Sequence, residues 1–427
     1  MNEALARWAY SAALVVSTPL YLARLWGRGA REPAYRGRLA ERLGWQRSRR
    51  PTAPVLWLHA VSLGETRAAA PLIDALRARW PQASLLLTCS TATGADAGKD
   101  LLRAGDAQAW LPYDTPGAVR RFLRHWRPAV GVLMETEVWP NLVHAARELH
   151  VPLVLANARL SAKSLRQGQR FAALLRPALQ GITRVLAQTE GDGQRLREFG
   201  AEAVEVCGNL KFDVAPPAAL LAQGAAWRAA LGRPVVLAAS TRDGEEPPLL
   251  AAWRALPAPR PLLLIVARHP QRFDAVAALI ERAGFTLARR SAWSDTPNAP
   301  DAEVWLGDSI GEMALYGACA DVALLGGSFA PLGGQNLIEL AACGTPVVMG
   351  PSTFNFAQAA ELALDAGAAL RVADIDAGVR QAAVIATVGD RAGRRERALA
   401  FAAAHRGATE RIARRIVELM VSAPAGR

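Results

Sequence analysis

The hydrophobic pattern along the chain repeats short apolar runs, each followed by a polar or glycine-containing turn and a longer stretch rich in alanine and arginine. Apolar runs without polar alternation are typical of strands in a parallel sheet, because such a sheet is buried on both faces. The alanine- and arginine-rich stretches have the composition expected of helices that connect parallel strands. The pattern therefore predicts an α/β fold made of doubly wound sheets.

The predicted strands form two groups, separated by a stretch rich in proline and alanine. The first group lies at residues 55–61, 84–89, 130–134, 153–156 and 185–187, and the second at 235–239, 262–267, 304–306, 322–325, 347–349 and 370–372. We expect an amino-terminal Rossmann-like domain at 51–213, a linker at 214–228, and a carboxyl-terminal Rossmann-like domain at 229–427 that ends in one or two helices. Ligands bind beyond the carboxyl ends of the strands in such sheets, so the two domains are expected to face a cleft.

The amino-terminal segment predicts a membrane anchor. Residues 8–26 are apolar and bracketed by aromatic side chains, with no charge before Arg24. About 17–25 such residues cross a bilayer, so 1–50 are expected to form a single anchor and a basic juxtamembrane segment. Residues 24–50 hold nine arginines against two glutamates, which favours a protein body on the cytoplasmic face. The alternative is a helix lying in the membrane interface, because the stretch is short and contains Pro19.

Charge and cysteine content limit the classes of partner. The net charge of +12 indicates an anionic partner, which is an acidic membrane surface, a phosphorylated substrate or nucleic acid. Nucleic acid is disfavoured because the chain has no recognisable module that interleaves basic and aromatic residues. The four cysteines lack C-x-x-C spacing, which favours buried thiols over a metal site. Asp374 and Asp376 resemble a two-aspartate metal clamp, but they precede a helix, where aspartates commonly act as caps.

Three side chains that can carry chemistry lie in the first predicted domain. Glu65 opens a helix after the first strand, where the helix dipole favours a carboxylate and where it can also act as a general base. Glu135 follows the strand at 130–134 beside a second carboxylate, and two acids at a strand end need solvent or a partner. Lys211, one of three lysines, can stabilise a departing phosphate or a sugar carboxylate, or can pair with a neighbour such as Asp213.

Polar motifs also follow the strands predicted in the second domain. Arg268 and His269 come directly after the strand at 262–267 and suit a phosphate and a hydrogen bond respectively, although both can serve the fold alone. The motif GDSIGEM at 307–313 follows the next strand and opens a helix. Because the carboxyl ends of parallel strands lie at one edge, these motifs are expected to meet there.

The segment at 322–351 reads as strand, glycine-rich turn, helix and strand, and it is the predicted nucleotide site. The glycines at 333 and 334 allow the backbone to approach a ligand. Asn336 can cap the following helix and leave amide groups directed at a phosphate. Glu339 either completes a capping box with Asn336 or binds ribose hydroxyls, and both roles are compatible.

Taken together, these motifs resemble the 3-deoxy-D-manno-octulosonic acid (Kdo) transferases of lipopolysaccharide synthesis. The motifs that carry the resemblance are, in chain order, HAVSLGE, METEVWPN, NARLS, GNLKFD, RHPQRF, GDSIGEM and GGSFAPLGGQNLIE. The resemblance implies a two-domain glycosyltransferase of the GT-B type at the inner membrane. It implies inverting transfer of Kdo from CMP-Kdo to a lipid A precursor, lipid IVA, with neither a metal nor another cofactor. The chain departs from the family at Gln335, where the family has histidine, so no step is expected to depend on a histidine there.

The resemblance also implies roles for individual residues. Glu65 is implied as the general base, and Glu135 and Lys211 as groups that stabilise the transition state. The implied contacts to CMP are Arg268, His269, Gly311, Glu312, Met313, Asn336, Leu337, Ile338 and Glu339.

Two other functions remain open from the sequence. A GT-B enzyme that uses a UDP-sugar would need the same architecture, and the nucleotide that raises the melting temperature would separate the two. A non-catalytic, membrane-anchored lipid or nucleotide binder is the other, and it would leave Glu65 and Glu135 without a role.

Overall fold

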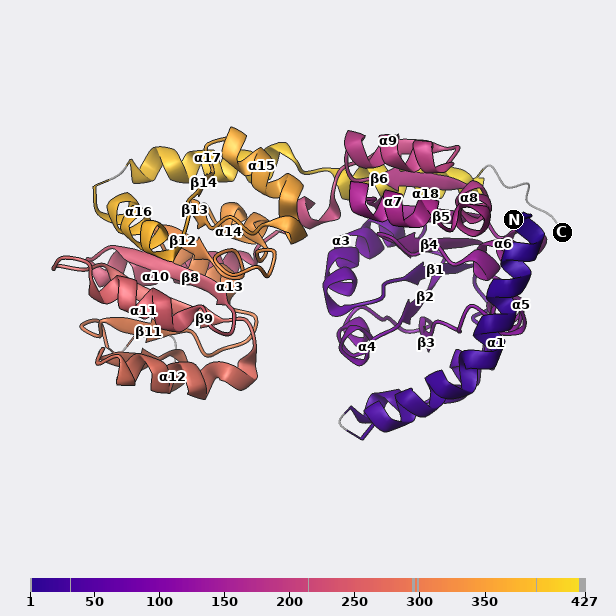
Figure 1. Cartoon of the computed structure of the whole chain (residues 1–427), viewed down its shortest axis with the longest axis horizontal. Coiled ribbons are helices and arrows are strands. Elements are labelled where there is room, and N and C mark those ends of the chain that lie inside the picture. Colours follow the sequence, from indigo (N-terminus) through magenta and orange to yellow (C-terminus); the bar gives the residue numbers. More distant parts are fainter. Residues whose placement is uncertain are drawn as a thin grey trace. The chain divides into compact units, whose positions relative to one another are not determined.

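The computed structural model describes residues 2–30, 32–213, 215–293, 296–297, 299–388 and 390–421, and it divides into two compact units. The first unit holds residues 1–213 and 406–427, and the second holds 214–405. In the described part of the chain, each unit contains one seven-stranded sheet, and every strand pair is parallel. Helices flank each sheet (Figure 1), so the predicted α/β architecture is confirmed.

The first sheet has the strand order β3-β2-β1-β4-β5-β6-β7. Its strands are β1 (Val55–His59), β2 (Ser84–Cys89), β3 (Ala107–Trp110), β4 (Val130–Met134), β5 (Leu153–Ala158), β6 (Arg184–Ala187) and β7 (Val204–Val206). Every residue of β1, β4 and β5 is buried, as their unbroken apolar runs predict. The direction of strand addition reverses between β1 and β4, and ligands bind at this kind of point in doubly wound sheets.

Local capping signals set where the helices of the first unit begin and end. The helices that follow its strands are α3 (Leu63–Arg79), α4 (Ala92–Lys99), α5 (Pro116–Trp126), α6 (Pro140–Glu148), α7 (Ala162–Gln169), α8 (Ala172–Gln180) and α9 (Glu190–Phe199). The hydroxyls of Ser62 and Thr189 accept hydrogen bonds from the first turns of α3 and α9. Proline is the first residue of both α5 and α6, and Gly200 ends α9 in a left-handed conformation.

Alternate strand residues of the first sheet supply two separate apolar layers. Trp57 of β1 packs edge-on against Phe122 of α5, with ring centroids 5.1 Å apart, in the layer on one face. Leu56 and Leu58 belong to the layer on the other face, which α3 covers. This alternation follows from the period of two in a strand.

The last helix, α18 (Ala408–Val421), belongs to the first unit, which corrects the predicted domain division. It was expected in the carboxyl-terminal domain at 229–427, but it packs against α3, and Ile412 and Ile416 are fully buried in that layer (Figure 1). Asp213 accepts a hydrogen bond of 2.6 Å from the amide of Gly407, which ties the start of this helix to the first unit. The apolar face of α18 looks the same whichever sheet it covers, so its sequence does not reveal its partner.

The second sheet has the order β10-β11-β9-β8-β12-β13-β14. Its strands are β8 (Val235–Thr241), β9 (Leu262–Ala267), β10 (Leu287–Arg289), β11 (Val304–Leu306), β12 (Val322–Leu325), β13 (Val347–Met349) and β14 (Ala369–Arg371). Here the order reverses between β8 and β12. The strands that the sequence did not predict, β3, β7 and β10, all lie at sheet edges, where short and partly exposed strands carry a weak apolar signal.

The predicted linker at 214–228 is largely a helix, which is a second correction. The helices of the second unit are α10 (Ala218–Leu231), α11 (Glu246–Arg254), α12 (Phe273–Arg282), α13 (Met313–Cys319), α14 (Leu337–Ala342), α15 (Ala357–Asp365), α16 (Ile375–Thr387) and α17 (Arg391–Ala404). Trp227 of α10 is buried and packs edge-on against Trp293 and Trp305 at centroid distances of 5.7 and 6.3 Å. Short 3₁₀ turns occur at Pro33–Tyr35, Leu210–Asp213, Pro270–Arg272, Arg290–Ala292 and Phe354–Phe356.

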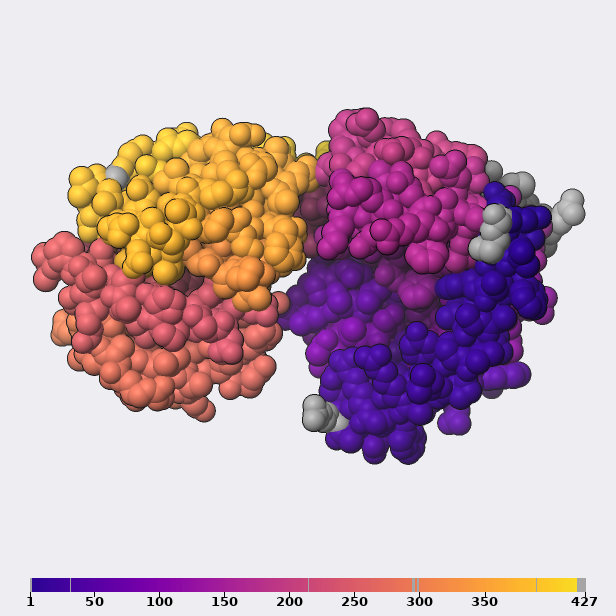
Figure 2. Space-filling model, in the orientation of Figure 1, coloured from indigo at the N-terminus to yellow at the C-terminus, as the bar shows by residue number. Residues whose placement is uncertain are grey.

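The helix α1 (Glu3–Arg28) lies on the surface of the first unit (Figure 2), and the four-residue helix α2 (Leu39–Arg42) follows it. The hydroxyl of Tyr10 donates a hydrogen bond of 3.1 Å to Asp114, and α1 also packs against α6 and α8. The other side of α1 exposes apolar side chains, including 69 % of Trp8, 81 % of Val16 and 74 % of Leu20. No helix in the described ranges is both long and apolar enough to cross a membrane, so the expected spanning anchor is not supported.

Candidate active site

The predicted site residues lie in loops that leave the carboxyl edge of each sheet. In the first unit, Glu65 follows β1 and Glu135 follows β4, the two strands between which the order reverses. In the second unit, the loops after β8 and β12 flank the corresponding point, and Arg268 follows β9 beside it. Each half of the predicted site therefore lies where its own sheet can bind a ligand.

Glu65 sits in the first turn of α3 and completes a capping box with Ser62. Its carboxylate accepts a hydrogen bond of 2.8 Å from the amide of Val61 and one of 3.2 Å from the Ser62 hydroxyl. The Ser62 hydroxyl in turn accepts a hydrogen bond from the amide of Glu65 at 3.4 Å. The carboxylate is therefore held in one position in the first turn of α3, where the helix dipole also favours a negative charge.

The surroundings of Glu65 also suit a base. Burial raises the pKa of Glu65 above its usual range, and the carboxylates of Glu135 and Glu137 raise it further. The hydrogen bonds from Val61 and Ser62 act in the opposite direction and lower the pKa. A raised pKa makes a carboxylate a stronger base near neutral pH, which is the requirement for taking a proton from a hydroxyl.

Glu135 is buried and bound by two cations. Its carboxylate lies 3.3 Å from the ammonium of Lys211 and 2.9 Å from Nε of Arg159. Its backbone has a φ of 57°, a left-handed conformation that is uncommon outside glycine and is often found at functional sites. The structure thus brings together two residues that the sequence placed in separate motifs, and it adds Arg159, for which the sequence indicated no role.

A buried asparagine positions the loop that carries Lys211. Asn157 lies at the carboxyl end of β5, also with a left-handed φ of 53°, and its Oδ1 accepts a hydrogen bond of 3.1 Å from the amide of Leu210. The side chain of Asn209 donates a hydrogen bond to Gln188 at 3.0 Å, and Gln188 donates to the carbonyl of Asn157 at 2.9 Å. This network places the ammonium of Lys211 beside Glu135. Nothing in the local sequence signals these contacts, because the residues are far apart along the chain.

A pocket of about 300 Å³ lies along the same edge of the first unit. It is lined by the aromatic side chains of Tyr21, Tyr113 and Trp139 and by the basic side chains of Arg24, Arg28 and Arg42. The Trp139 indole donates a hydrogen bond of 2.8 Å to Glu137, one of the carboxylates that raise the pKa of Glu65. Burial lowers the pKa of Arg42 to about 10, which still leaves its guanidinium charged at neutral pH. The sequence analysis did not identify this pocket, because three of these residues belong to α1.

If Glu65 is the base, its pKa determines where the kcat/KM profile falls on the acid side. The rate falls as the pH drops through the pKa of Glu65, because only the deprotonated carboxylate accepts a proton. We expect Glu137→Gln to move the acid limb of the kcat/KM profile to lower pH, because it removes a negative charge that raises this pKa. The matched substitution Glu198→Gln, at an exposed position of α9, is expected to leave the profile in place. An unmoved limb in Glu137→Gln would exclude Glu65 as the group that titrates.

In the second unit, basic side chains gather at the ends of β8 and β9. Arg268 is exposed, and its amide donates a hydrogen bond of 2.9 Å to the carbonyl of Thr241. Burial lowers the pKa of His269, and the positive charges of Arg242, Arg268 and Arg272 lower it further. His269 is therefore a neutral hydrogen-bonding group within a cationic cluster, and such a cluster attracts an anion.

Arg272, to which the sequence assigned no role, stabilises the loop that carries this cluster by binding a buried carboxylate. Its guanidinium makes two hydrogen bonds, of 2.7 and 2.9 Å, to the fully buried carboxylate of Glu246. The Thr241 hydroxyl donates a third hydrogen bond of 2.7 Å to the same carboxylate. The pair joins the start of α11 to the loop after β9 and so holds the loop that carries Arg268 and His269.

In the motif at 307–313, backbone groups are more available to a ligand than side chains are. Gly311 has a φ of 87°, a conformation that suits glycine. Burial alone would raise the pKa of Glu312, but hydrogen bonds from Ser309 and Arg290 outweigh it and lower the pKa. Glu312 thus stays ionised and bound to Arg290 at 2.9 Å, directly before Met313, the first residue of α13.

The loops after β8 and β12 approach each other closely at Gly326, at the start of the segment that leads to the glycine-rich turn. A side chain at Gly326 would lie 2.2 Å from the carbonyl oxygen of Ser240, so only glycine fits there. Asn336 caps α14 by accepting a hydrogen bond of 3.2 Å from the amide of Ile338, which confirms its predicted capping role. The side chains of Leu337 and Ile338 are buried in the unit, so only their backbone is available to a ligand. Glu339 lies half-buried in the first turn of α14.

The structure also bears on the predictions about cysteines and metals. All four cysteines are buried free thiols, as their spacing predicted. Asp374 caps α16 through a hydrogen bond of 2.8 Å from the amide of Ala377, which agrees with the capping interpretation. Within the described ranges, no group of three or more histidine, cysteine, aspartate or glutamate side chains is arranged to hold a metal ion.

Comparison with known proteins gives a family for the whole chain. A family model described as 3-deoxy-D-manno-octulosonic-acid transferase (kdotransferase) matches residues 37–214. The 3-deoxy-D-manno-octulosonic acid transferase of Bordetella pertussis is 50 % identical, over 95 % of this chain and 97 % of the relative. The transferase of the same name from Haemophilus influenzae is 36 % identical, over 86 % of this chain and 87 % of the relative.

Solved structures confirm the fold class. A glycosyltransferase from Rickettsia africae has a TM-score of 0.57 at 12 % identity, covering 86 % of this chain and 98 % of its own. The UDP-GlcNAc 2-epimerase of Neisseria meningitidis bound to UDP-GlcNAc has a TM-score of 0.56 at 15 % identity, covering 86 % and 99 %. Identities this low establish the fold alone. Together with the two parallel sheets, they show the GT-B fold.

Proposed function

Because this chain belongs to the 3-deoxy-D-manno-octulosonic acid transferase family, we propose that it moves Kdo from CMP-Kdo to the lipid A precursor lipid IVA and releases CMP. The observation that carries the proposal is the environment of Glu65. Its carboxylate is fixed by a capping box. Burial raises its pKa, and the nearby negative charges of Glu135 and Glu137 raise it further.

The proposed reaction is a single displacement. Glu65 accepts the proton of the acceptor hydroxyl as the hydroxyl oxygen forms a bond to the anomeric carbon of Kdo. The bond between that carbon and the phosphate oxygen of CMP breaks, and CMP leaves with the electron pair. Attack from the side opposite to the leaving group inverts the configuration at this carbon. Because CMP is a good leaving group, one base and cationic support suffice.

Lys211 and Glu135 act in the proposal as a positioned charge pair. Lys211 supplies positive charge that stabilises the transition state, and Glu135 orients this ammonium at 3.3 Å. Arg159, on the other carboxylate oxygen of Glu135, holds that carboxylate in place. Both cations are supplied by the chain itself, so this part of the mechanism calls for no metal ion.

The proposed donor site is the basic cluster of the second unit. Arg268 and His269 bind the phosphate of CMP, and Arg242 adds positive charge. The remaining proposed contacts come from the loop at 311–313 and from residues 336–339. The backbone provides most of these, because the side chains of Leu337 and Ile338 face the core.

The proposed acceptor site is the pocket lined by aromatic and basic residues on the first unit. Its arginines suit the phosphate groups of lipid IVA, and its aromatic walls suit the faces of sugar rings. We place the protein at the cytoplasmic face of the inner membrane, with α1 lying in the membrane interface. The exposed apolar side chains of α1 support this placement, as does the net charge of +12, which favours an anionic membrane surface.

The proposal is tested by incubating the full chain with lipid IVA and CMP-Kdo that is generated in the assay. We expect lipid IVA to gain mass in whole Kdo increments, and the number of increments gives the number of sugars added. We expect the same rate when EDTA is added after CMP-Kdo has formed, because arginine and lysine supply the positive charge at the transferase site. CMP, but not UDP, is expected to raise the melting temperature. Stabilisation by UDP alone would instead favour a UDP-sugar donor, and loss of transfer in EDTA would contradict the metal-free mechanism.

A further inference from the structure

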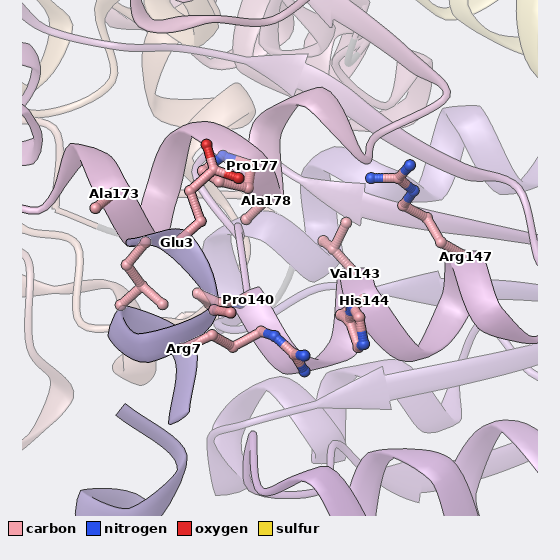
Figure 3. A pocket seen from close by; sticks show the side chains of 11 residues that line it. Glu3, Arg7, Pro140, Val143, His144, Arg147, Ala173, Pro177 and Ala178 are labelled. Atoms are coloured by element: carbon pink, nitrogen blue, oxygen red, sulfur yellow. The ribbon is translucent and has the colours of Figure 1, made fainter. Parts of the chain in front are cut away.

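A second pocket of the first unit lies away from the residues assigned to transfer. It has a volume of about 220 Å³ and is formed where α1 begins, between α6 and α8 (Figure 3). Pockets for drug-sized ligands measure roughly 300–1,000 Å³, so this one suits a smaller chemical group. None of the residues discussed for the reaction lines it.

Two arginines contribute to the lining of this pocket, and no described residue of the chain neutralises their positive charges. The side chain of Arg7, from α1, extends toward His144 of α6, and Arg147 lies one turn further along α6 (Figure 3). The guanidinium groups of Arg7 and Arg147 have no ion-pair or hydrogen-bond partner in the described part of the chain. Arg7 is half-buried and Arg147 is exposed, so both guanidinium groups can reach an anion that enters the pocket.

The acidic groups near the pocket do not neutralise these arginines. Glu148 is already bound to Arg120 at 2.9 Å and to His144 at 3.0 Å. Glu3 is exposed in the first turn of α1, and its carboxylate extends away from Arg7 (Figure 3).

The rest of the pocket is apolar and opens beside the apolar face of α1. Val143, Leu174 and Pro177 form its walls. On the side of α1 turned away from the protein, Leu5 is 54 % exposed and Trp8 is 69 % exposed. A ligand of this pocket therefore combines a compact anion with apolar groups. The adjoining exposed surface of α1 is also apolar, so it suits contact with the hydrocarbon part of a membrane.

We infer that this pocket binds the phosphate headgroup of an anionic membrane phospholipid. The phosphate binds the guanidinium of Arg7, Arg147 adds positive charge from one turn further along α6, and the glycerol and first acyl carbons contact Val143, Leu174 and Pro177. Arginine binds phosphate through charge-assisted hydrogen bonds, and the apolar walls distinguish a lipid from a free phosphate compound. Such a site binds one lipid molecule at a defined place, unlike the diffuse attraction between a basic protein and an anionic surface.

The inference is tested by titrating the full chain, by calorimetry, with dihexanoyl-phosphatidylglycerol below its micelle concentration. We expect binding at one site, no measurable binding of dihexanoylglycerol, which lacks the phosphate, and at least roughly ten-fold weaker binding of glycerol 3-phosphate, which lacks the acyl chains. Equal binding of glycerol 3-phosphate would identify a free phosphate compound as the ligand, and equal binding of dihexanoylglycerol would show a purely apolar pocket. Either result would overturn the inference.

Two variants locate the binding site. Arg7→Gln removes one phosphate contact and is expected to weaken phosphatidylglycerol binding roughly ten-fold. Ala173→Phe fills the pocket without changing its charge and is expected to weaken the same binding, while the melting temperature shows whether the fold is intact. The control Arg124→Gln removes the same charge from an exposed position of α5 outside the pocket, and it should bind like the wild type. If Arg7→Gln binds as tightly as Arg124→Gln, the pocket is not the lipid site.

Discussion

Replacing Glu65 by glutamine is expected to lower the kcat for Kdo transfer by about 10²–10⁴-fold, the usual contribution of a general base. Glutamine keeps the size of the side chain and an oxygen that can accept the hydrogen bond from Val61, so α3 should retain most of its cap. It cannot take a proton from the acceptor hydroxyl. The measurement is the rate of gain of Kdo mass on lipid IVA, made on protein whose melting temperature matches that of the wild type.

Two further variants separate the chemical role of Glu65 from its capping role. Ser62→Ala removes the cap and keeps the carboxylate, so it should cost about 1 kcal/mol of stability and retain most of the activity. Glu190→Gln makes the same chemical change in the first turn of α9, where the carboxylate is exposed, and should leave kcat unchanged. Full activity in Glu65→Gln would assign the base to another group and reduce Glu65 to a helix cap.

Replacing Arg272 by alanine is expected to destabilise the second unit by about 3–5 kcal/mol, because it leaves the fully buried carboxylate of Glu246 without its ion-pair partner. Unfolding of the two units need not coincide, so hydrogen exchange resolved to the peptides of α11 and β9 is the appropriate measurement. The double variant Arg272→Met/Glu246→Leu removes both charges and is expected to recover most of the lost protection.

The neighbouring Arg268 provides the matched comparison. It is exposed, so Arg268→Ala should leave hydrogen exchange in α11 and β9 unchanged but weaken CMP binding and raise KM for CMP-Kdo. The two arginines lie four positions apart and are chemically identical, yet one is expected to stabilise the fold and the other to bind the donor. If Arg272→Ala leaves protection in α11 unchanged, the buried pair does not hold this loop.

Much of the fold is encoded locally, and particular residues show why. The strands at 262–267, 304–306, 322–325 and 347–349 were predicted with the bounds that the structure has, because each is a buried apolar run that ends at a polar or glycine residue. The same local logic predicted the cap at Asn336 and placed Glu65 in the first turn of a helix. Strand ends and helix caps depend on a few consecutive residues, so a sequence reports them directly.

The organisation of the site depends on contacts between distant segments. Glu135 and Lys211 are 76 positions apart, and they meet because β4 and the chain after β7 reach the same edge of one sheet. Arg159 and Arg272 lie within motifs of the family, but the motifs did not indicate their roles, since an arginine that binds a buried carboxylate is indistinguishable in sequence from one in solvent. For the same reason the residues of α1 that line the pocket beside Trp139 could not be recognised.

The sequence by itself thus determined the α/β class, the position of most strands, the family and the candidate residues, because these depend on local periodicity and on contiguous motifs. Tertiary structure alone decided that α18 covers the first sheet, that 218–231 is a packed helix, and that α1 lies against the first unit. It also decided which charges neutralise one another and which remain available to a ligand. The physical reason is that an amphipathic helix or a charged side chain has an equally favourable local sequence in many packings, and only the full set of long-range contacts selects one of them.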